Sequence, residues 1–221
     1  MTLVSAHRCL THAAIEAAIA LGADYVEFDV QRIADGSLVL LHDLVDDPPA
    51  GTLRYDEALA LLAGRARAHL DLKLRGGEIP IVTEAIARLG TDRLLVTTHH
   101  DEAVRALRAW ADREGHDLQV GLSLGQGVKG FSLWHAIRVR ASELFPGVRY
   151  RAAGANVVVA HHWLARLRVR RFARRHRLPL VVWTVDTPRS LAHWMRPGRA
   201  WLVTTNQPQV ALDLRAGRLR A

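Results

Sequence analysis

The sequence has a single cysteine, Cys9, and only two lysines, Lys73 and Lys129, among its 221 residues. One cysteine excludes an internal disulfide bond. No run of about 18 apolar residues occurs, which excludes a transmembrane helix of ordinary length. The first strand-like segment begins within three residues of the start and leaves no room there for a signal peptide, so we expect a cytoplasmic protein.

Negative charge is also scarce. The 22 acidic residues face 30 basic ones, of which all but two are arginine, and the net charge is +8. The preference for arginine reflects genome composition and indicates no function, whereas a basic chain in general attracts polyanions such as anionic lipids and phosphate substrates. An apolar content of 49% suffices for one core. Because no linker, repeat or low-complexity segment interrupts the chain, we predict one domain over residues 1–221.

Apolar segments of strand length alternate with helical patterns along the whole chain. The expected strands are Leu3–His7, Tyr25–Val30, Ala68–Leu74, Leu94–His99, Gln119–Leu124, Asn156–His161, Leu180–Val185 and Trp201–Thr205. The helical patterns include Ala13–Leu21, Tyr55–Leu62, Ile79–Leu89, Asp101–Arg113, Leu133–Phe145, Leu164–His176 and Pro188–Met195. Such alternation predicts an α/β fold with a parallel sheet covered by helices. Eight units in this length predict a (β/α)8 TIM barrel, with a doubly wound open sheet as the alternative.

Two of the expected strands carry charged side chains on one face. Alternate residues of a strand share a face, so Glu27 and Asp29 point to the same side, and Asp71 and Lys73 do so in their own strand. Charges on the interior side of an apolar strand are costly unless they are paired or bind a metal. Three carboxylates converging from two strands favour a site for Mg²⁺ or Ca²⁺. The alternative is a structural ion-pair network with Arg8 and Lys73.

Two short apolar strands end in a histidine. His7 follows the first strand and precedes Arg8, and His42 follows Leu38–Leu41, which begins after the hairpin signal Asp35-Gly36. Imidazole titrates near neutral pH, so two histidines flanking a pair of carboxylates indicate proton transfer. A single histidine at a strand end, by contrast, is more often structural.

The order of these motifs resembles that of the glycerophosphodiester phosphodiesterase family. The matching elements are His7-Arg8, Gly22-Ala23-Asp24, Glu27-x-Asp29, Asp35-Gly36, His42-Asp43 and Asp71-x-Lys73. Three later segments, Val96–His99, Val182–Asp186 and Val203–Pro208, are similar to the family's fourth strand, its Trp-Thr-Val-Asn strand and its closing Thr-Asp-x-Pro segment. The resemblance therefore runs through most of the chain.

The chain also departs from the family pattern. Cys9 replaces the glycine after His-Arg, the loop with Glu-Asn-Thr is missing, and Asp71 stands where the family usually has Glu. The short stretch from His42 to Asp71 implies that the family's glycerol-covering insertion is reduced. The short first loop and the Asp-x-Lys element also resemble sphingomyelinase D-type phospholipase D. We expect Cys9 to be a small buried thiol rather than a nucleophile.

The resemblance implies a metal-dependent phosphodiester hydrolase that cleaves glycerophosphodiesters to glycerol phosphate and an alcohol. The implied residues are the metal ligands Glu27, Asp29 and Asp71, the base His7 and acid His42, and the phosphate- or substrate-binding residues Arg8, Lys73 and Trp183. One alternative is a phospholipase D-type enzyme acting on a lysophospholipid or sphingolipid. Another is a catalytically silent barrel that binds anionic surfaces. The expected partner is a small-molecule or lipid phosphodiester and not a nucleic acid, and the sequence indicates no oligomeric state.

Two further features bear on contact with an anionic membrane. Arginines crowd Leu164–His176, which is typical of a solvated outer face or, alternatively, of docking on anionic lipid. In the long connection from Gly125 to Ala155, Phe131–Trp134 is a candidate lid or lipid contact. Trp134, Ile137, Ala141 and Leu144 follow in helical spacing, so we expect most of that stripe to belong to the core.

Overall fold

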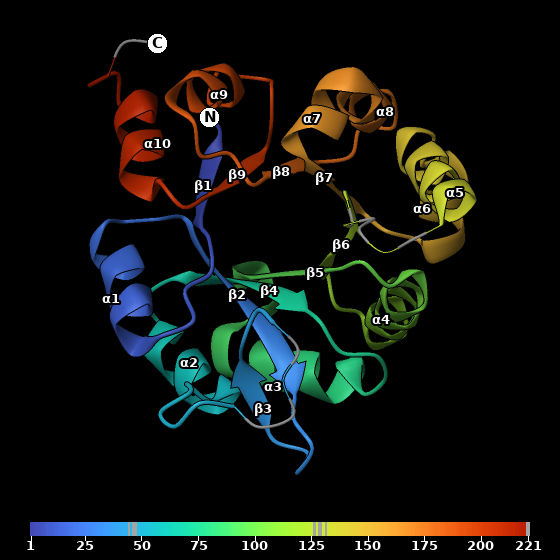
Figure 1. The fold of residues 1–221 in the computed structure, drawn as a ribbon. Helices are drawn as coiled ribbons and strands as arrows, with labels where there is room; N and C mark the ends of the chain where they lie inside the picture. The colour runs from blue at the N-terminus through green and yellow to red at the C-terminus, as the bar shows by residue number, and fades with distance from the viewer. Residues whose placement is uncertain (44, 46–47, 126, 128–129, 131, 220–221) are drawn as a thin grey trace.

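The computed structural model describes residues 1–43, 45, 48–125, 127, 130 and 132–219, and its centre is a closed barrel of parallel strands (Figure 1). The barrel strands are β1 (Leu3–Ala6), β2 (Tyr25–Arg32), β4 (Arg67–Leu72), β5 (Leu94–Thr98), β6 (Gln119–Leu124), β7 (Val157–His161), β8 (Leu180–Trp183) and β9 (Leu202–Thr205). Strand β1 pairs with both β2 and β9 and so closes the barrel. The predicted (β/α)8 barrel is confirmed, and the open-sheet alternative is wrong.

Helices surround the barrel on its outer side (Figure 1). They are α1 (His12–Ala20), α2 (Tyr55–Leu62), α3 (Glu78–Leu89), the 3₁₀ turn η1 (Thr91–Arg93), α4 (Asp101–Glu114), α5 (Leu133–Leu144), α6 (Gly147–Ala153), α7 (His162–Leu164), the π-helical segment η2 (Ala165–Val169), α8 (Arg170–Arg175), α9 (Pro188–Trp194) and α10 (Pro208–Arg215). The predicted helix Leu164–His176 is therefore a run of three segments. Helices α6 and α10 were not among the predicted patterns. Within the described ranges, no helix is both long and apolar enough to cross a bilayer.

A short hairpin extends β2 beyond the barrel. Strand β3 (Leu38–Leu40) pairs with β2 in antiparallel register, and Gly36 turns the chain with a φ of 88°. The hairpin predicted from Asp35-Gly36 is confirmed. The amide of Leu41 then donates to the carbonyl oxygen of Asp29, which brings the following residue, His42, beside Asp29. From there to β4 the described residues form one helix, α2, as the short connection implies.

The strands separate two apolar layers. On β2, Val26, Phe28 and Val30 are fully buried in the layer between strands and helices. A second cluster fills the barrel interior with residues that come early in their strands, among them Tyr25 and Leu202. Later positions on the interior face are polar, so the apolar floor of the barrel supports a polar upper layer. The predicted alternation on β2 is thus confirmed.

The apolar stripe of α5 lies largely outside the core, although Leu144 is partly buried against it. The side chains of Trp134 and Ile137 are 76% and 48% exposed, and the buried residue of this helix is Glu143. The carboxylate of Glu143 accepts a 2.7 Å hydrogen bond from the amide of Gly125 and a 2.6 Å hydrogen bond from Arg140. The core prediction is wrong because helical spacing identifies an apolar face without identifying what covers it. Phe131 lies outside the described residues.

Candidate active site

The predicted site residues gather at the carboxyl ends of the strands, where barrels of this kind place their active sites. All eight line one cavity of about 70 Å³: His7, Arg8, Glu27, Asp29, His42, Asp71, Lys73 and Trp183. A water molecule takes up about 30 Å³, so this space suits an ion, a few waters or one phosphoryl group. A larger substrate must extend through the mouth. A larger cavity, described below, lies elsewhere and has none of these side chains in its lining.

The strand register brings the three carboxylates together. Asp29 of β2 lies directly beside Asp71 of β4, and Glu27 precedes Asp29 by two residues on the same face. Glu27 and Asp29 are 3% and 1% exposed. One oxygen from each of the three carboxylates lies within 4.8 Å of the others. This spacing and these hard oxygen donors fit a Mg²⁺ or Ca²⁺ ion.

The charges of the cluster are only partly balanced. Lys73 Nζ lies 3.0 Å from Asp29 Oδ1 and also contacts Asp71 Oδ2. Burial, then the charges of Asp29 and Asp71, raise the pKa of Glu27 well above its usual value. Burial also opposes ionisation of Asp71, but Lys73, His99 and His69 together outweigh it and lower the pKa of that carboxyl. Ionisation of all three carboxylates beside one ammonium would leave about two negative charges, which a divalent cation would neutralise.

Arg8 connects the carboxylates with the histidines. Its backbone is in the left-handed region, with a φ of 53°, an uncommon conformation for a residue with a side chain. This conformation directs its amide to Glu27 Oε2 at 2.6 Å. Its guanidinium donates to His42 Nε2. One residue therefore orients a carboxylate through its backbone and meets a histidine through its side chain.

His7 is held in one tautomer by two residues from the far end of the chain. The amide nitrogen of Asn206 donates to Asp186 Oδ2 at 2.6 Å, and a carboxylate can only accept. The amide oxygen of Asn206 must therefore accept from His7 Nδ1, at 2.9 Å. His7 Nε2 is left without a proton, 4.0 Å from Glu27 Oε2. Burial lowers the pKa of His7 below its ordinary value, so this nitrogen is a base at neutral pH.

His42 makes the complementary arrangement. Its Nδ1 donates to Asp29 Oδ2 at 2.9 Å, and its Nε2 accepts from Arg8. Its side chain is 35% exposed and reaches the mouth of the cavity. The negatively charged carboxylate of Asp29 can stabilise a positive charge on the His42 ring. The partner of His7 Nδ1, the amide of Asn206, is neutral and cannot stabilise the His7 ring in this way.

His69 was not among the residues predicted for the site, but it contacts the site. Thr97 donates to Asp71 Oδ1 at 2.9 Å, so its hydroxyl oxygen accepts from His69 Nε2, at 3.1 Å. His69 Nδ1 in turn accepts from Ser5 Oγ at 3.2 Å. Burial lowers the pKa of His69 to about 4, so the ring is neutral and orients Asp71 through Thr97. His69 and Asp71 are two residues apart and share a face of β4, and this spacing could have indicated from the sequence that His69 lies at the site.

The remaining wall of the cavity is aromatic and polar. His99 Nδ1 donates to the carbonyl oxygen of Ser123 at 3.0 Å, and the His99 ring lies edge to face with Trp183 at 5.9 Å. Trp183 Nε1 and Thr204 Oγ1 are buried and have no hydrogen-bond partner within the described part of the chain. Both residues line the cavity. Cys9 is buried and its thiol pKa is raised to about 12, first by burial and then by Glu27. It is thus the small buried thiol that the sequence predicted.

Comparison with known proteins gives one sequence match and many structural ones. Residues 7–52 match the family model described as the glycerophosphoryl diester phosphodiesterase family. No curated protein matches the sequence. Among solved structures, the glycerophosphodiester phosphodiesterase from Agrobacterium tumefaciens superposes with a TM-score of 0.71 at 20% identity, covering 98% of this chain and 100% of that one.

Two further solved structures have the same fold. A second protein from Agrobacterium tumefaciens, described as a putative glycerophosphoryl diester phosphodiesterase, gives a TM-score of 0.75 at 17% identity over 99% of this chain and 98% of that one. A phosphodiesterase from Oleispira antarctica, solved with the product sn-glycerol-3-phosphate, gives 0.71 at 15% identity over 98% and 97%. The sequence of residues 7–52 and the barrel fold thus confirm the resemblance to the glycerophosphodiester phosphodiesterase family that the motif order predicted.

Proposed function

We propose that this protein is a metal-dependent phosphodiester hydrolase that cleaves glycerophosphodiesters to glycerol phosphate and an alcohol. One observation carries the proposal: two buried carboxylates, one half-buried carboxylate and two histidines, with their Nδ1 atoms held by different partners, converge on one small cavity. Acid and base chemistry on either side of a phosphate needs such an arrangement. The solved relative with sn-glycerol-3-phosphate supports the substrate class.

His7 is the proposed base. Its Nε2 carries no proton and faces the cavity, while Asn206 holds the opposite nitrogen. It would remove the proton from an attacking hydroxyl, either of water or of the substrate's own neighbouring group. In the second case the phosphorus–oxygen bond to the leaving alcohol breaks as a cyclic phosphate forms, and water opens the ring in a later step.

His42 is the proposed acid. Before substrate binds, its Nε2 accepts from the Arg8 guanidinium. A phosphate in the cavity would engage Arg8 by charge-assisted hydrogen bonds and release Nε2 to carry a proton. Asp29, bonded to Nδ1, stabilises the resulting imidazolium. The proton then passes from Nε2 to the oxygen of the leaving alcohol.

Glu27, Asp29 and Asp71 would hold the metal. When bound, a divalent ion withdraws charge from the phosphate oxygens and so makes phosphorus more electrophilic. Lys73 and Arg8 add positive charge beside those oxygens. Trp183 forms part of the wall and offers its indole N–H to the substrate.

A substrate screen with and without a chelator tests the proposal. Chelation should abolish hydrolysis of glycerophosphodiesters, and added Mg²⁺ or Ca²⁺ should restore it, the more effective ion being the preferred one. Asp29→Asn should behave like the chelated enzyme, and Glu84→Gln, on the outer side of α3, should behave like the wild type. Full turnover after exhaustive chelation would remove the metal from the mechanism.

The second candidate is a phospholipase D-type enzyme that acts on a lysophospholipid or sphingolipid. It is favoured by the short connection between β3 and β4, in which the described residues form one helix, α2. Comparing turnover of soluble glycerophosphodiesters with that of lysophospholipid in vesicles separates the two enzymes. If neither substrate is turned over, the remaining hypothesis is a catalytically silent barrel that binds anionic surfaces.

A further inference from the structure

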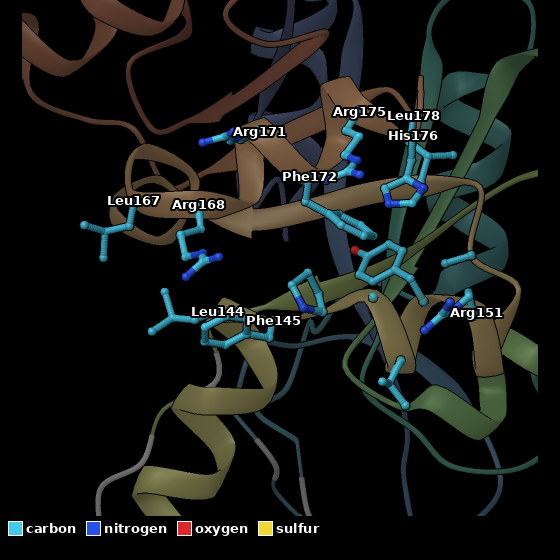
Figure 2. A pocket seen from close by; sticks show the side chains of 15 residues that line it. Leu144, Phe145, Arg151, Leu167, Arg168, Arg171, Phe172, Arg175, His176 and Leu178 are labelled. Atoms are coloured by element: carbon cyan, nitrogen blue, oxygen red, sulfur yellow. The ribbon is translucent and has the colours of Figure 1, made fainter.

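An open groove of about 1070 Å³ lies between the α5–α6 pair and the segment η2–α8 (Figure 2). The apolar and aromatic part of its lining includes Phe145, Pro146, Leu167 and Phe172. Tyr150 forms the floor, with its ring 5.4 Å from that of Phe172 and its hydroxyl bonded to the carbonyl oxygen of Leu122. The groove is thus an apolar surface on the outer side of the barrel.

The exposed face of α5 continues this apolar surface. Trp134, Ile137, Ala141 and Phe145 are spaced by three or four residues and so lie along one face of the helix. The two aromatic residues, Trp134 and Phe145, are 76% and 59% exposed. Leu167, on the opposite wall of the groove, is 63% exposed. A contiguous exposed apolar surface of this kind marks a site of interaction with a protein, a ligand or a membrane.

Arginines surround the apolar surface. Residues 144 to 185 contain nine arginines and no Asp or Glu. Arg168 lies over the ring of Phe145 at 4.1 Å, and Arg171 and Arg175 line the same wall of the groove (Figure 2). Within the described ranges, no carboxylate lies at ion-pair distance from these three side chains. An uncompensated positive rim calls for an anionic partner.

One end of this surface, formed by α5 and the π-helical segment, adjoins the mouth of the active site, whereas Ala155 and Leu178 line its other end near the amino ends of β7 and β8. The hydrogen bond between Glu143 and the amide of Gly125 fixes the last turns of α5 at the carboxyl end of β6. The π-helical segment follows shortly after the carboxyl end of β7, and α5 packs against it. A binding partner on this surface would therefore lie beside the opening through which a substrate enters the active site.

We propose that this apolar groove and its arginine rim form a docking surface for an anionic phospholipid bilayer. The arginines would meet the lipid phosphates, and the exposed face of α5 would enter the interface, a depth that tryptophan favours. Nucleic acid would account for the arginines but would leave the aliphatic side chains Ile137 and Leu167 uncovered. Docking is a separate property of the chain and does not depend on the proposed hydrolysis.

Partition of the full-length protein onto vesicles tests the proposal. The wild type should sediment with vesicles of phosphatidylglycerol and phosphatidylcholine and not with phosphatidylcholine alone. Removing three charges with Arg168→Gln, Arg171→Gln and Arg175→Gln should weaken partition about a hundredfold at about 0.01 M salt. The difference should nearly vanish at about 1 M salt, where the Debye length is about 3 Å. The matched control Arg88→Gln, Arg93→Gln and Arg218→Gln removes the same charge elsewhere and should partition like the wild type.

A second variant isolates the apolar contribution. Trp134→Ser with Ile137→Ser alters exposed side chains only, so the fold should be retained, and its partition should be weaker than wild type at low and high salt alike. Turnover of a soluble diester should be unchanged in all variants. Equal partition of the wild type and the groove variant at low salt would overturn the proposal. Binding to a duplex DNA that requires the three groove arginines, without partition onto anionic vesicles, would overturn it in favour of nucleic acid.

Discussion

The contact between His7 and Asn206 leads to a prediction for the pH dependence of catalysis. An exchange, Asp186→Asn with Asn206→Asp, keeps the hydrogen-bonded pair and the net charge but moves the carboxylate next to His7 Nδ1. It also places in both segments the residues that the resembled family carries there. In the wild type, the charge of Asp186 acts on His7 only across the amide of Asn206.

The size of the effect follows from the geometry. A carboxylate at the 2.9 Å position that the amide oxygen now occupies should raise the pKa of His7 by about 1–3 units. The side chain of His7 is 13% exposed, so solvent screens the new interaction only in part. Because the charge at position 186 is removed at the same time, we expect a value near the lower end, about 1–2 units, or roughly 1.4–2.7 kcal/mol.

The sign of the change in rate follows from the role of His7. A base acts in its neutral form, and the fraction of neutral His7 rises as pH rises through its pKa. A higher pKa therefore moves the acidic limb of the profile of kcat/KM against pH upward by the same number of units. Above the new limb, turnover should equal or exceed that of the wild type, because a stronger base removes the proton more readily.

Two measurements decide the matter. The first is the pH profile of the exchanged variant on a soluble glycerophosphodiester at constant ionic strength. The second is the single variant Asp186→Asn, in which the Asn206 amide loses its fixed orientation and His7 its fixed tautomer. That variant should lose about 10²-fold in kcat, and its acidic limb should move slightly downward rather than upward, because the charge of Asp186 that raises the pKa of His7 is gone. An acidic limb that stays in place after the exchange would refute His7 as the titrating base.

Three further outcomes are expected. His7→Ala and His42→Ala should each lower kcat by about 10²-fold or more, and a leaving group of low pKa should partly rescue only His42→Ala; the reverse rescue would exchange acid and base. Mg²⁺ or Ca²⁺ at a hundred times its Kd should stabilise the fold by about 2.7 kcal/mol in thermal unfolding, and Asp29→Asn should abolish this gain; an equal gain in the variant would place the ion elsewhere. Thr97→Val should cost about 1–3 kcal/mol in denaturant unfolding, because it leaves an oxygen of Asp71 without its donor, and an unchanged midpoint would argue against the network.

The sequence alone determined the architecture and the candidate residues. Strand-length apolar runs alternating with helical patterns admit few folds, and a period of two in β2 requires Glu27 and Asp29 to share a face. The hairpin that carries His42 was visible in Asp35-Gly36. These features are local, because they depend on residues a few positions apart, and the structure confirms them.

Only the tertiary structure decided how distant residues meet. His7 and Asn206 are 199 positions apart, and the closure of β1 on β9 brings them to 2.9 Å. The register that sets Asp29 beside Asp71 likewise follows from packing of the whole barrel. The apolar stripe on α5 is a case in which a local pattern was misleading. Its periodicity predicted burial, but the buried residue of that helix is Glu143. Which face is covered depends on the neighbours that the fold supplies, and no local pattern contains that information.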